Sequence, residues 1–460
     1  MARGKKKETL TPEERLQAAL VPESEQPYKV PENWCWTALK HISSHISDGS
    51  HNPPKDSGKG IPLLSATNIR DHLIDIDSAV RWITEDQWTI ENQRTKIETN
   101  DVLLTIVASI GRTAVVKNEQ FALQRSVAVI KPKINSEFLS YYFESPYIQQ
   151  FMLDNAKGTA QKGFYLNSLV ELFCCVPPLA EQQRIVDRIE SLFAKLDEAK
   201  QNVQDALDNF ETRKAAILHR AFTGELTAQW RKEHGVGMES WENSTVGQVC
   251  HDVKVGIVIK PSQYYTDEEK GTPAFRSANV RENRIDDFDW VYLNHTGMEN
   301  NSRSIVHTGD VLVVRSGNPG TACVVSEKFD GYNAIDILIA VPDHRKISSE
   351  FLCAYTNSPF GKKLIFENKR GMALAHFNVK GYSGLPIRVP QLNEQAKIIC
   401  ILDDLLAKEQ QAKEAAEGVL EQIDLIKKAI LARAFRGELG TNDPSEESAQ
   451  ELIKNFIFKM

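Results

Sequence analysis

The clearest pattern of hydrophobic and polar positions in this chain is a heptad repeat that occurs twice. Within residues 181–222 the apolar side chains recur in alternating steps of four and three, at Ile185, Ile189, Leu192, Leu196, Ala199, Val203, Ala206 and Phe210. A similar stripe runs through residues 394–435, with a break at Glu409. This spacing is typical of helices in a left-handed coiled coil. The pattern therefore predicts two long helices.

Both predicted helices have recognisable ends. Each begins after prolines with a glutamate in its first turn, Glu181 or Glu394, and each ends before a glycine, Gly224 or Gly437. At about 1.5 Å per residue, each helix is a rod of about 60 Å. We expect the two apolar stripes to pack against each other antiparallel, as an internal two-fold requires. In the alternative, each helix packs only on its own domain or mediates homodimerisation.

The segments before these helices predict a mixed α/β structure. Runs rich in β-branched residues, bounded by Gly, Asn or Pro, predict strands at residues 101–106, 113–117, 126–130, 310–315, 322–325 and 335–341. A short helix is predicted after each set of strands, at residues 136–155 and 349–368. The fold class is therefore α+β, with two α/β domains joined by two long antiparallel helices.

The chain is an internal repeat. Residues 176–182 (VPPLAEQ) return as residues 389–395 (VPQLNEQ), and this offset of 213 gives 22 identities over 51 positions. Weaker echoes relate residues 62–70 to residues 273–281. The helices of the two copies are alike, whereas the preceding domains have diverged. The predicted organisation is an N-terminal tail (1–29), a first domain (30–178), a central helical region (179–235), a second domain (236–390), a C-terminal helical region (391–440) and a tail or short helix (441–460).

Composition places the chain among soluble globular proteins. Hydrophobic residues make up 41% and charged residues 25% of its 460 residues. We find no apolar run long enough for a membrane span and no secretory signal. The seven cysteines show no C-x-x-C spacing, which favours free thiols in a reducing cytoplasm. The formal net charge of −7 has the wrong sign for a simple nucleic-acid binder.

No motif in the sequence predicts catalysis or metal binding. Residues 52–55 (NPPK) begin like the N-P-P-[FY] motif of adenine methyltransferases, but Lys55 cannot stack on a base and no glycine-rich cofactor loop follows a strand. The P-loop pattern is missing. His41, His45 and His51 lack the spacing of a metal site and have no cysteine in range.

The repeated motifs resemble those of the specificity (S) subunits of type I restriction–modification enzymes. The resemblance rests on the P-x-L-x-E-Q start of each helix and on I-L-x-R-A-F-x-G-E-L at residues 217–226 and 430–439, with Trp230 and Arg231 after the first. Residues 46–54 (ISDGSHNPP) also resemble the family's D-G-[ST]-H-x-x-P, which includes Asp48 and His51. The second copy departs from it, with VGIVIKP at residues 255–261.

This resemblance implies a DNA-recognition subunit without chemistry of its own. Each diverged domain would read one half of a split double-stranded DNA target, and the helices would set the spacing and bind two modification (methyltransferase) subunits. Restriction or translocase subunits would join through the methyltransferase. S-adenosylmethionine, ATP and Mg²⁺ would be bound by the partners, so this chain itself needs no cofactor.

Candidate DNA-binding residues are polar side chains in the loops between strands and helices, because base edges and phosphates are read by such groups. They are Asn68, Arg70, Arg112, Gln124, Arg125, Lys157, Gln161, Lys162, Arg276, Asn279, Arg281, Arg315, Asn318, Lys369, Arg370, His376 and Asn378. Residues 345–388 also contain eight basic side chains against two acidic ones, which predicts a local phosphate-binding patch.

Two other functions remain open on the sequence alone. A self-sufficient DNA methyltransferase or nuclease would need the cofactor and carboxylate motifs that we do not find. A coiled-coil scaffold that binds only protein would show no preference among DNA sequences.

Overall fold

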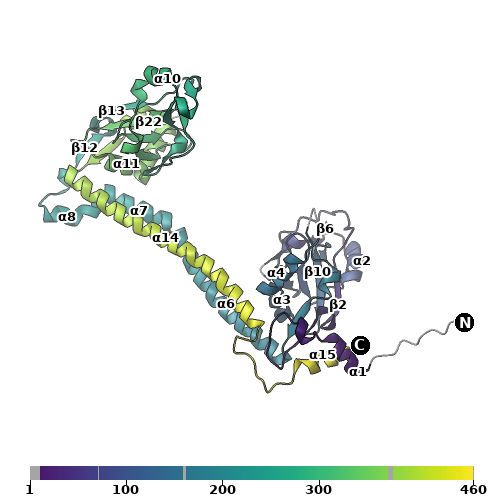
Figure 1. The fold of residues 1–460 in the computed structure, drawn as a ribbon. Coiled ribbons are helices and arrows are strands. Elements are labelled where there is room, and N and C mark those ends of the chain that lie inside the picture. The colour runs from purple at the N-terminus through teal and green to yellow at the C-terminus, as the bar shows by residue number, and fades with distance from the viewer. Residues whose placement is uncertain (1–10, 71, 159–161, 371–376, 459–460) are drawn as a thin grey trace. The chain divides into compact units, whose positions relative to one another are not determined.

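The chain folds into two compact units that repeat one architecture. The computed structural model describes residues 11–70, 72–158, 162–370 and 377–458, without the side chains of residues 368–370. Unit 1 comprises residues 1–203 and 418–460, and unit 2 comprises residues 204–417. Each unit therefore holds one diverged domain together with a part of each long helical region (Figure 1).

The domain of unit 1, recognition domain 1, is built on a four-stranded antiparallel sheet. Its strand order is β2 (Ser43–Asp48), β10 (Val127–Pro132), β7 (Val102–Thr105) and β8 (Thr113–Val115). A second sheet has β3 (Ile61–Leu64) between antiparallel β6 (Trp82–Ile83) and parallel β9 (Ala122–Leu123). Smaller elements are β4 (Ile69–Arg70), β5 (Leu73–Ile74), α2 (Glu85–Thr95) and α5 (Leu166–Leu169). The predicted strands of this domain are confirmed.

The domain of unit 2, recognition domain 2, repeats this topology. Its main sheet has the order β13 (Cys250–Val255), β22 (Ile337–Pro342), β19 (Val311–Val314) and β20 (Ala322–Val324). In the second sheet β15 (Thr272–Phe275) lies between antiparallel β18 (Val291–Leu293) and parallel β21 (Asn333–Ala334), with β14 (Tyr265–Thr266) beyond β18. Smaller elements are β16 (Val280–Arg281), β17 (Arg284–Ile285), α8 (Ala228–Glu233), α9 (Val246–Val249), α10 (His295–Asn300) and α13 (Val379–Ser383).

Each domain also contains a two-stranded antiparallel sheet whose second strand ends just before a long helix begins. In unit 1, β1 (Cys35–Ala38) pairs with β11 (Phe173–Val176), and in unit 2, β12 (Glu242–Thr245) pairs with β23 (Pro386–Val389). The predicted N-terminal tail contains helix α1 (Pro12–Ala19), whose capping box at Thr11 and Glu14 fixes its start. Helix α1 packs on α15 (Ala449–Phe458) at the other end of the chain (Figure 1).

The helix predicted at residues 136–155 is two helices, and so is its counterpart in unit 2. The structure has α3 (Ser136–Glu144) and α4 (Pro146–Asp154), then α11 (Ser349–Asn357) and α12 (Pro359–Arg370). The cause is the Ser-Pro pair in each segment. Ser145 and Ser358 are extended, with ψ of 142° and 154°, because a residue before proline avoids the helical region.

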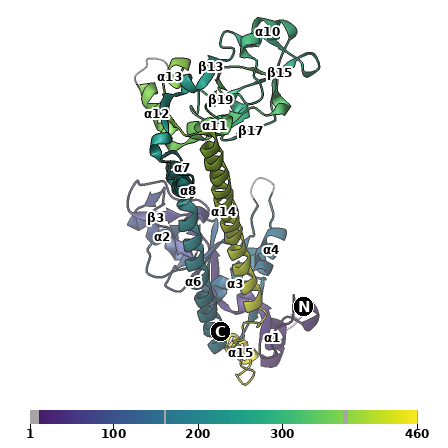
Figure 2. The same cartoon turned by 90° about the vertical axis from the view of Figure 1, so that its left-hand side faces the viewer.

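The long helices are antiparallel in each unit, as the heptads predict. In unit 1, α6 (Leu179–Asp208) lies beside α14 (Leu392–Ala434) (Figure 2). Asp197 and Lys200 of α6 pair at 2.5 Å and 3.4 Å with Lys427 and Asp424 of α14. Residue numbers rise along α6 as they fall along α14. In unit 2, Arg213 of α7 (Phe210–Phe222) bonds Glu409 of α14 at 2.9 Å. The break in the second apolar stripe is therefore an ion-pair position.

The first long helix is not continuous, which corrects the prediction of a single rod over residues 181–222. Helix α6 ends at Asp208 and α7 begins at Phe210. The side-chain amide of Asn209 donates to the Asp205 carbonyl oxygen at 2.8 Å, and the Arg213 guanidinium donates to the Ala206 carbonyl oxygen at 3.0 Å. Side chains that donate hydrogen bonds to helix carbonyl oxygens in this way compete with the backbone hydrogen bonds of the helix.

The cysteines and the helices are consistent with the free thiols and the missing membrane span expected from the sequence. All seven cysteines are free thiols and six of them are buried. Burial raises the pKa of Cys35 and of Cys323 to about 12. Over the described ranges, no helix combines the length and the apolar character needed to cross a membrane.

Candidate nucleic-acid interface

Four loops of recognition domain 1 converge on one open groove of about 320 Å³. They follow β2, β3, β7 and β9, so the two sheets bring together segments far apart in sequence. The groove is lined by Ser50, His51, Pro53, Ser65, Ala66, Thr67, Val107, Ala108, Ser109, Gln124, Arg125 and Ser126. Two of the predicted DNA-binding residues, Gln124 and Arg125, lie in it.

A glycine allows the loop after β2 to enter this groove. The loop lies beside the segment between β9 and β10, where Ser50 N–H donates to the Leu123 carbonyl oxygen at 2.7 Å and Arg125 N–H donates to the Ser50 carbonyl oxygen at 3.0 Å. A Cβ atom on Gly49 would lie 2.3 Å from the same Leu123 oxygen. Glycine is therefore required for this close backbone approach.

Recognition domain 2 contains the same close approach of two loops, which we call the loop crossing, although the sequence there departs from the D-G-[ST]-H-x-x-P motif. Ile257 N–H donates to the Ala334 carbonyl oxygen at 2.8 Å, and Asp336 N–H donates to the Ile257 carbonyl oxygen at 3.0 Å. A Cβ atom on Gly256 would lie 2.3 Å from the Ala334 oxygen. Glycine is thus the motif residue that the loop crossing requires in both domains.

The acidic residue of the motif is a structural group in recognition domain 1. The Asp48 carboxylate is 6% exposed and bonds both the Arg94 guanidinium and His51 Nε2, the latter at 2.8 Å. Arg94 Nε also donates to the Asp48 carbonyl oxygen at 3.1 Å. These bonds tie α2 to the end of β2 and orient His51 at the rim of the groove. Sequence reasoning did not find Arg94, which lies outside the motif.

Two further candidates border the groove of recognition domain 1. Lys157 and Gly163 are joined by two backbone hydrogen bonds of 2.9 Å, one in each direction. Ala108, whose φ is +67°, donates its N–H to the Lys162 carbonyl oxygen at 3.2 Å. Lys157 and Lys162 are both exposed. Gln161 lies outside the described residues.

In recognition domain 2 the equivalent loops hold an ion pair between a half-buried arginine and an exposed aspartate. Arg315 Nη1 lies 3.3 Å from the Asp336 carboxylate, and Asp336 stands where recognition domain 1 has Arg125. The Arg315 side chain is 15% exposed. Asn318 on the same loop is exposed. Asn378 accepts the Gly381 N–H at 2.8 Å and so caps α13.

Two predicted asparagines are buried and hold their own loops. Asn68 is 4% exposed, accepts the Ser65 N–H at 2.9 Å and donates to the Asp75 carbonyl oxygen at 3.2 Å. Asn279 is 1% exposed and makes the equivalent bonds to Arg276 N–H and the Asp286 carbonyl oxygen. These amides have no capacity left for a base.

The arginines next to these asparagines are paired within their own hairpins. Arg70 bonds Asp75, and Arg281 Nε lies 2.9 Å from Asp286 in the equivalent hairpin. Arg276 Nη2 lies 2.8 Å from Asp289. Both copies of the repeat therefore contain the same arginine–aspartate ion pair, Arg70 with Asp75 and Arg281 with Asp286.

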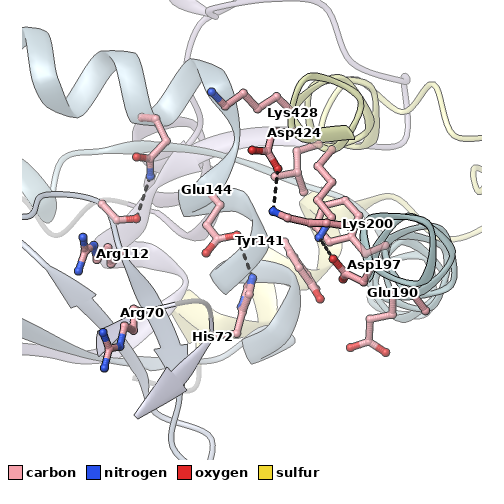
Figure 3. A pocket seen from close by; sticks show the side chains of 16 residues that line it. Arg70, His72, Arg112, Tyr141, Glu144, Glu190, Asp197, Lys200, Asp424 and Lys428 are labelled. Atoms are coloured by element: carbon pink, nitrogen blue, oxygen red, sulfur yellow. Dashed lines mark hydrogen bonds and ion pairs between the residues drawn. The ribbon is translucent and has the colours of Figure 1, made fainter. Parts of the chain in front are cut away.

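Arg70 and Arg112 line a second, larger cleft of unit 1 instead of the loop groove. This cleft of about 1010 Å³ lies between the recognition domain and the paired helices α6 and α14. Figure 3 shows the two arginines on one wall and Glu190, Asp197 and Lys200 of α6 on another. His72 Nε2 bonds Glu144 at 2.8 Å near its centre (Figure 3). Acidic and basic side chains alternate here, so the cleft has no uniform positive charge.

Two of the eight basic residues predicted to form a patch at residues 345–388 are paired with carboxylates that the sequence count did not include. Arg345 bonds Asp343 at 2.9 Å and holds the pKa of that carboxyl well below its usual range. Lys362 bonds Glu282 from the hairpin between β16 and β17. The partners lie outside the counted segment, and one of them lies 80 residues away. Lys369 and Arg370 end α12, their side chains are outside the described set, and His376 is outside the described residues.

The Glu-Gln pair at the start of each long helix has a role that sequence reasoning missed. Glu394 is 1% exposed and accepts bonds from Thr227 Oγ1 at 2.6 Å, Arg231 Nη1 at 2.6 Å and Trp241 Nε1 at 3.0 Å. Gln395 accepts the Ser348 N–H at 2.8 Å. The pair thus joins the helix start to the recognition domain and to the segment after α7.

Unit 1 repeats this arrangement with other donors. Glu181 is fully buried and accepts bonds from Trp34 Nε1 at 2.8 Å and from Thr441 and Asn442 after α14. Gln182 accepts the Asn135 N–H at 2.9 Å. The sequence indicated this role only through the identical Glu-Gln pair in both copies. The burial of the pair explains why both copies contain it.

Comparisons with known proteins agree with this architecture. A family model described as "Type I restriction modification DNA specificity domain" matches residues 54–207 and 238–418. The EcoBI specificity subunit of a type I restriction enzyme from Escherichia coli is 35% identical over 222 residues, 47% of this chain and 46% of that relative. This match spans about half the length of that protein. The EcoKI specificity subunit from Escherichia coli strain K12 is 23% identical over 440 residues, which cover 89% of this chain and 90% of the relative.

Two solved structures share the fold. A chain from a structure described as "Structural basis underlying complex assembly and conformational transition of the type I R-M system" superposes with a TM-score of 0.64 and 20% identity, over 90% of this chain and 100% of that one. The crystal structure of the HsdS subunit from Thermoanaerobacter tengcongensis gives a TM-score of 0.61 at 20% identity, with the same coverage.

Proposed function

Because this chain belongs to the DNA specificity family of type I restriction–modification systems, we propose that it selects the DNA target of such a complex and performs no chemistry itself. Each recognition domain reads one half of a bipartite double-stranded site. The observation that carries this proposal is the duplicated loop crossing, with Gly49 in one domain and Gly256 in the other. One scaffold thus presents two different sets of loop side chains.

The side chains of the two loop sets support different base preferences. Recognition domain 1 offers Gln124 and Arg125, whose amide and guanidinium groups suit adenine and guanine edges in the major groove. Recognition domain 2 has Asp336 at the place of Arg125 and presents Asn318 on the neighbouring loop. We therefore expect the two half-sites to differ in sequence.

The charge of this chain is consistent with a subunit that acts inside a complex. Its formal net charge is −7, and ion pairs already hold Arg70, Arg281 and Lys362. Two modification subunits that close around the duplex would supply the missing phosphate neutralisation. They would also bind S-adenosylmethionine, and restriction subunits that join them would bind ATP and Mg²⁺. The paired helices would set the spacer and dock the modification subunits, in the cytoplasm.

The exchange of one domain tests this function. Residues 30–175 are replaced by the matching domain of another family member, and methylated motifs are mapped in cells that carry the modification subunits. One half of the motif should change while the other half and the spacer length stay. The reciprocal exchange of residues 236–390 is the matched control. A change in both halves after a single exchange would show one composite reading surface, and methylation without sequence preference would favour the protein-scaffold alternative.

A further inference from the structure

The loop after β13 in recognition domain 2 exposes two neighbouring apolar side chains. Val258 is 48% exposed and Ile259 is 75% exposed. They belong to the segment VGIVIKP, which stands where recognition domain 1 has the D-G-[ST]-H-x-x-P motif. Counted from the glycine of the loop crossing, the same two places in recognition domain 1 hold His51 and Asn52, which are exposed and polar. The two domains therefore present different chemistry at one equivalent position.

The loop crossing fixes the position of this apolar pair. The Ile257 carbonyl oxygen accepts the Asp336 N–H at 3.0 Å, and the Ile257 side chain is 5% exposed in a small core that includes Ile335. Val258 follows directly on this anchored residue. Because Asp336 is the counterpart of the groove residue Arg125, the apolar pair lies beside the loop expected to contact DNA.

A turn anchors the other end of the pair. Lys260 has a left-handed backbone with φ of +41°, and its carbonyl oxygen accepts the Gln263 N–H at 3.1 Å. A 3-10 helix begins at the next residue, Pro261. The fold thus holds Val258 and Ile259 between two hydrogen-bonded residues. Their β-branched side chains have few rotamers, so a contact with a ligand costs them little entropy.

Charged groups lie at both ends of the apolar pair. The Asp336 side chain is 42% exposed and pairs with Arg315, and Lys260 is an exposed cation. Single exposed apolar residues are common on protein surfaces, but two in succession between charged groups suit a target of mixed chemistry. The major groove of DNA is such a target. Its base edges are polar except for the methyl group of thymine, and phosphates lie beside them.

We propose that Val258 and Ile259 contact the C5-methyl groups of thymines in the half-site that recognition domain 2 reads. This proposal rests on the proposed function, which supplies the DNA. Apolar side chains are the groups that recognise this methyl group in other protein–DNA contacts. At the equivalent place, recognition domain 1 offers His51 and Asn52 for polar contacts instead. The two half-sites are thus distinguished by an apolar contact as well as by Asp336 and Arg125.

Replacement of thymidine by deoxyuridine tests the contact, because it removes only the methyl group. The complete complex with its modification subunits is titrated with duplexes that carry the mapped target, and each thymidine is replaced in turn. The half-site of recognition domain 2 is known from the domain exchange. In that half-site, at least one replacement should weaken binding about fourfold, the scale of one buried methyl group.

Ile259→Ser should abolish this sensitivity, so that the affinity ratio of the thymidine and deoxyuridine duplexes falls to about one at the affected position. Val258→Ser is the second variant and should act at the same or an adjacent position. Phe288→Ser removes another apolar side chain of this domain, which is 60% exposed, and should keep the wild-type ratio. Ratios for the other half-site should not change in I259S. Because both duplexes are measured with one preparation, any inactive fraction cancels in the ratio.

Four results would overturn the proposal. They are a wild-type ratio of one at every thymidine of this half-site, a wild-type ratio retained in both I259S and V258S, an equal loss of affinity for all duplexes in I259S, and weaker binding of modification subunits by I259S without DNA. The third result would indicate a wedge between bases and the fourth a protein contact. Preference of the wild-type complex for its target over a scrambled duplex is measured in parallel, and only its absence counts against the proposed function.

Discussion

Arg231 and Glu394 form a buried ion pair in unit 2, with 2.6 Å between Arg231 Nη1 and Glu394 Oε1. Their side chains are 7% and 1% exposed. Arg231 also donates to the Gly224 carbonyl oxygen at 2.6 Å, so one guanidinium links the end of α7 to the start of α14. The pair holds the segment after one repeated helix against the base of the other.

Arg231→Met should therefore destabilise unit 2 by about 3 to 5 kcal/mol, because it leaves the Glu394 carboxylate buried without its counter-charge. The nearby Trp241 indole lies 5.9 Å from the Arg231 guanidinium and can report unfolding by fluorescence during a urea titration. Arg220→Met is the matched control. It breaks an exposed pair with Glu225 at 3.6 Å and should cost less than about 1 kcal/mol. Equal losses in the two variants would contradict a special role of the buried pair.

Gly49→Ala should disturb recognition domain 1 alone. Its Cβ atom would meet the Leu123 carbonyl oxygen at 2.3 Å, and the crossing must open to relieve this clash. Overpacking of this kind costs about 1 to 3 kcal/mol, and one half of the methylated motif should lose its specificity. Gly418→Ala serves as the control, since no atom lies within 4 Å and helix propensity should stabilise it by up to about 1 kcal/mol. An unaltered motif in G49A would show that this crossing does not shape the reading loops.

Arg125→Ala should weaken reading of one half-site. The side chain is exposed in the groove of recognition domain 1. If it contacts a base, specificity at one position should fall by about 1 to 3 kcal/mol. If it contacts a phosphate, binding to all sequences should weaken together and the salt dependence should decrease. Asn318→Ala is the companion variant and should affect only the other half-site. Binding of a set of duplexes with single-base changes separates these outcomes.

A matched insertion in both helices should lengthen the spacer of the target. Seven residues inserted after Ala199 in α6 and after Asp424 in α14 keep the apolar stripes in phase, because Lys200 pairs with Asp424. Seven residues add about 10.5 Å of helix, close to three base pairs of about 3.4 Å each. The mapped motif should keep both half-sequences. An active double insertion with an unchanged spacer would show that other contacts position the domains, and insertion in one helix alone should abolish assembly.

The contribution of Glu282 to stability should disappear in acid. Burial acts to raise the pKa of Glu282, but hydrogen bonds from Lys214 and Lys362 outweigh it and hold the pKa below the ordinary 4.5. A lowered folded-state pKa stabilises the protein above the ordinary value and loses this effect as the pH falls through the folded value. The difference in unfolding free energy between wild type and E282Q should therefore be constant above pH 5 to 6 (about one unit above the ordinary value) and shrink below about pH 4. A difference that persists at low pH would assign it to packing.

Much of this organisation was predictable because it depends on local or repeated sequence. The strand at residues 310–315 and its counterpart at residues 101–106 were found from β-branched runs and are β19 and β7. Two of the loop residues chosen from the sequence, Gln124 and Arg125, line the groove of recognition domain 1. Asn68 was chosen by the same criterion, a polar residue in a loop after a strand, yet it is 4% exposed and bonded to its own loop. Sequence position does not reveal which way a loop side chain faces.

The two-copy architecture and the antiparallel helices follow from the sequence, because heptad spacing and internal identity are properties of the chain read in order. Which charged groups are paired and which motif residues are structural depends on the three-dimensional fold. Glu394 meets Arg231 across 163 residues, and Glu181 meets Thr441 across 260. Such pairs form only when folding brings distant segments within hydrogen-bond range, and burial then makes each partner depend on the other.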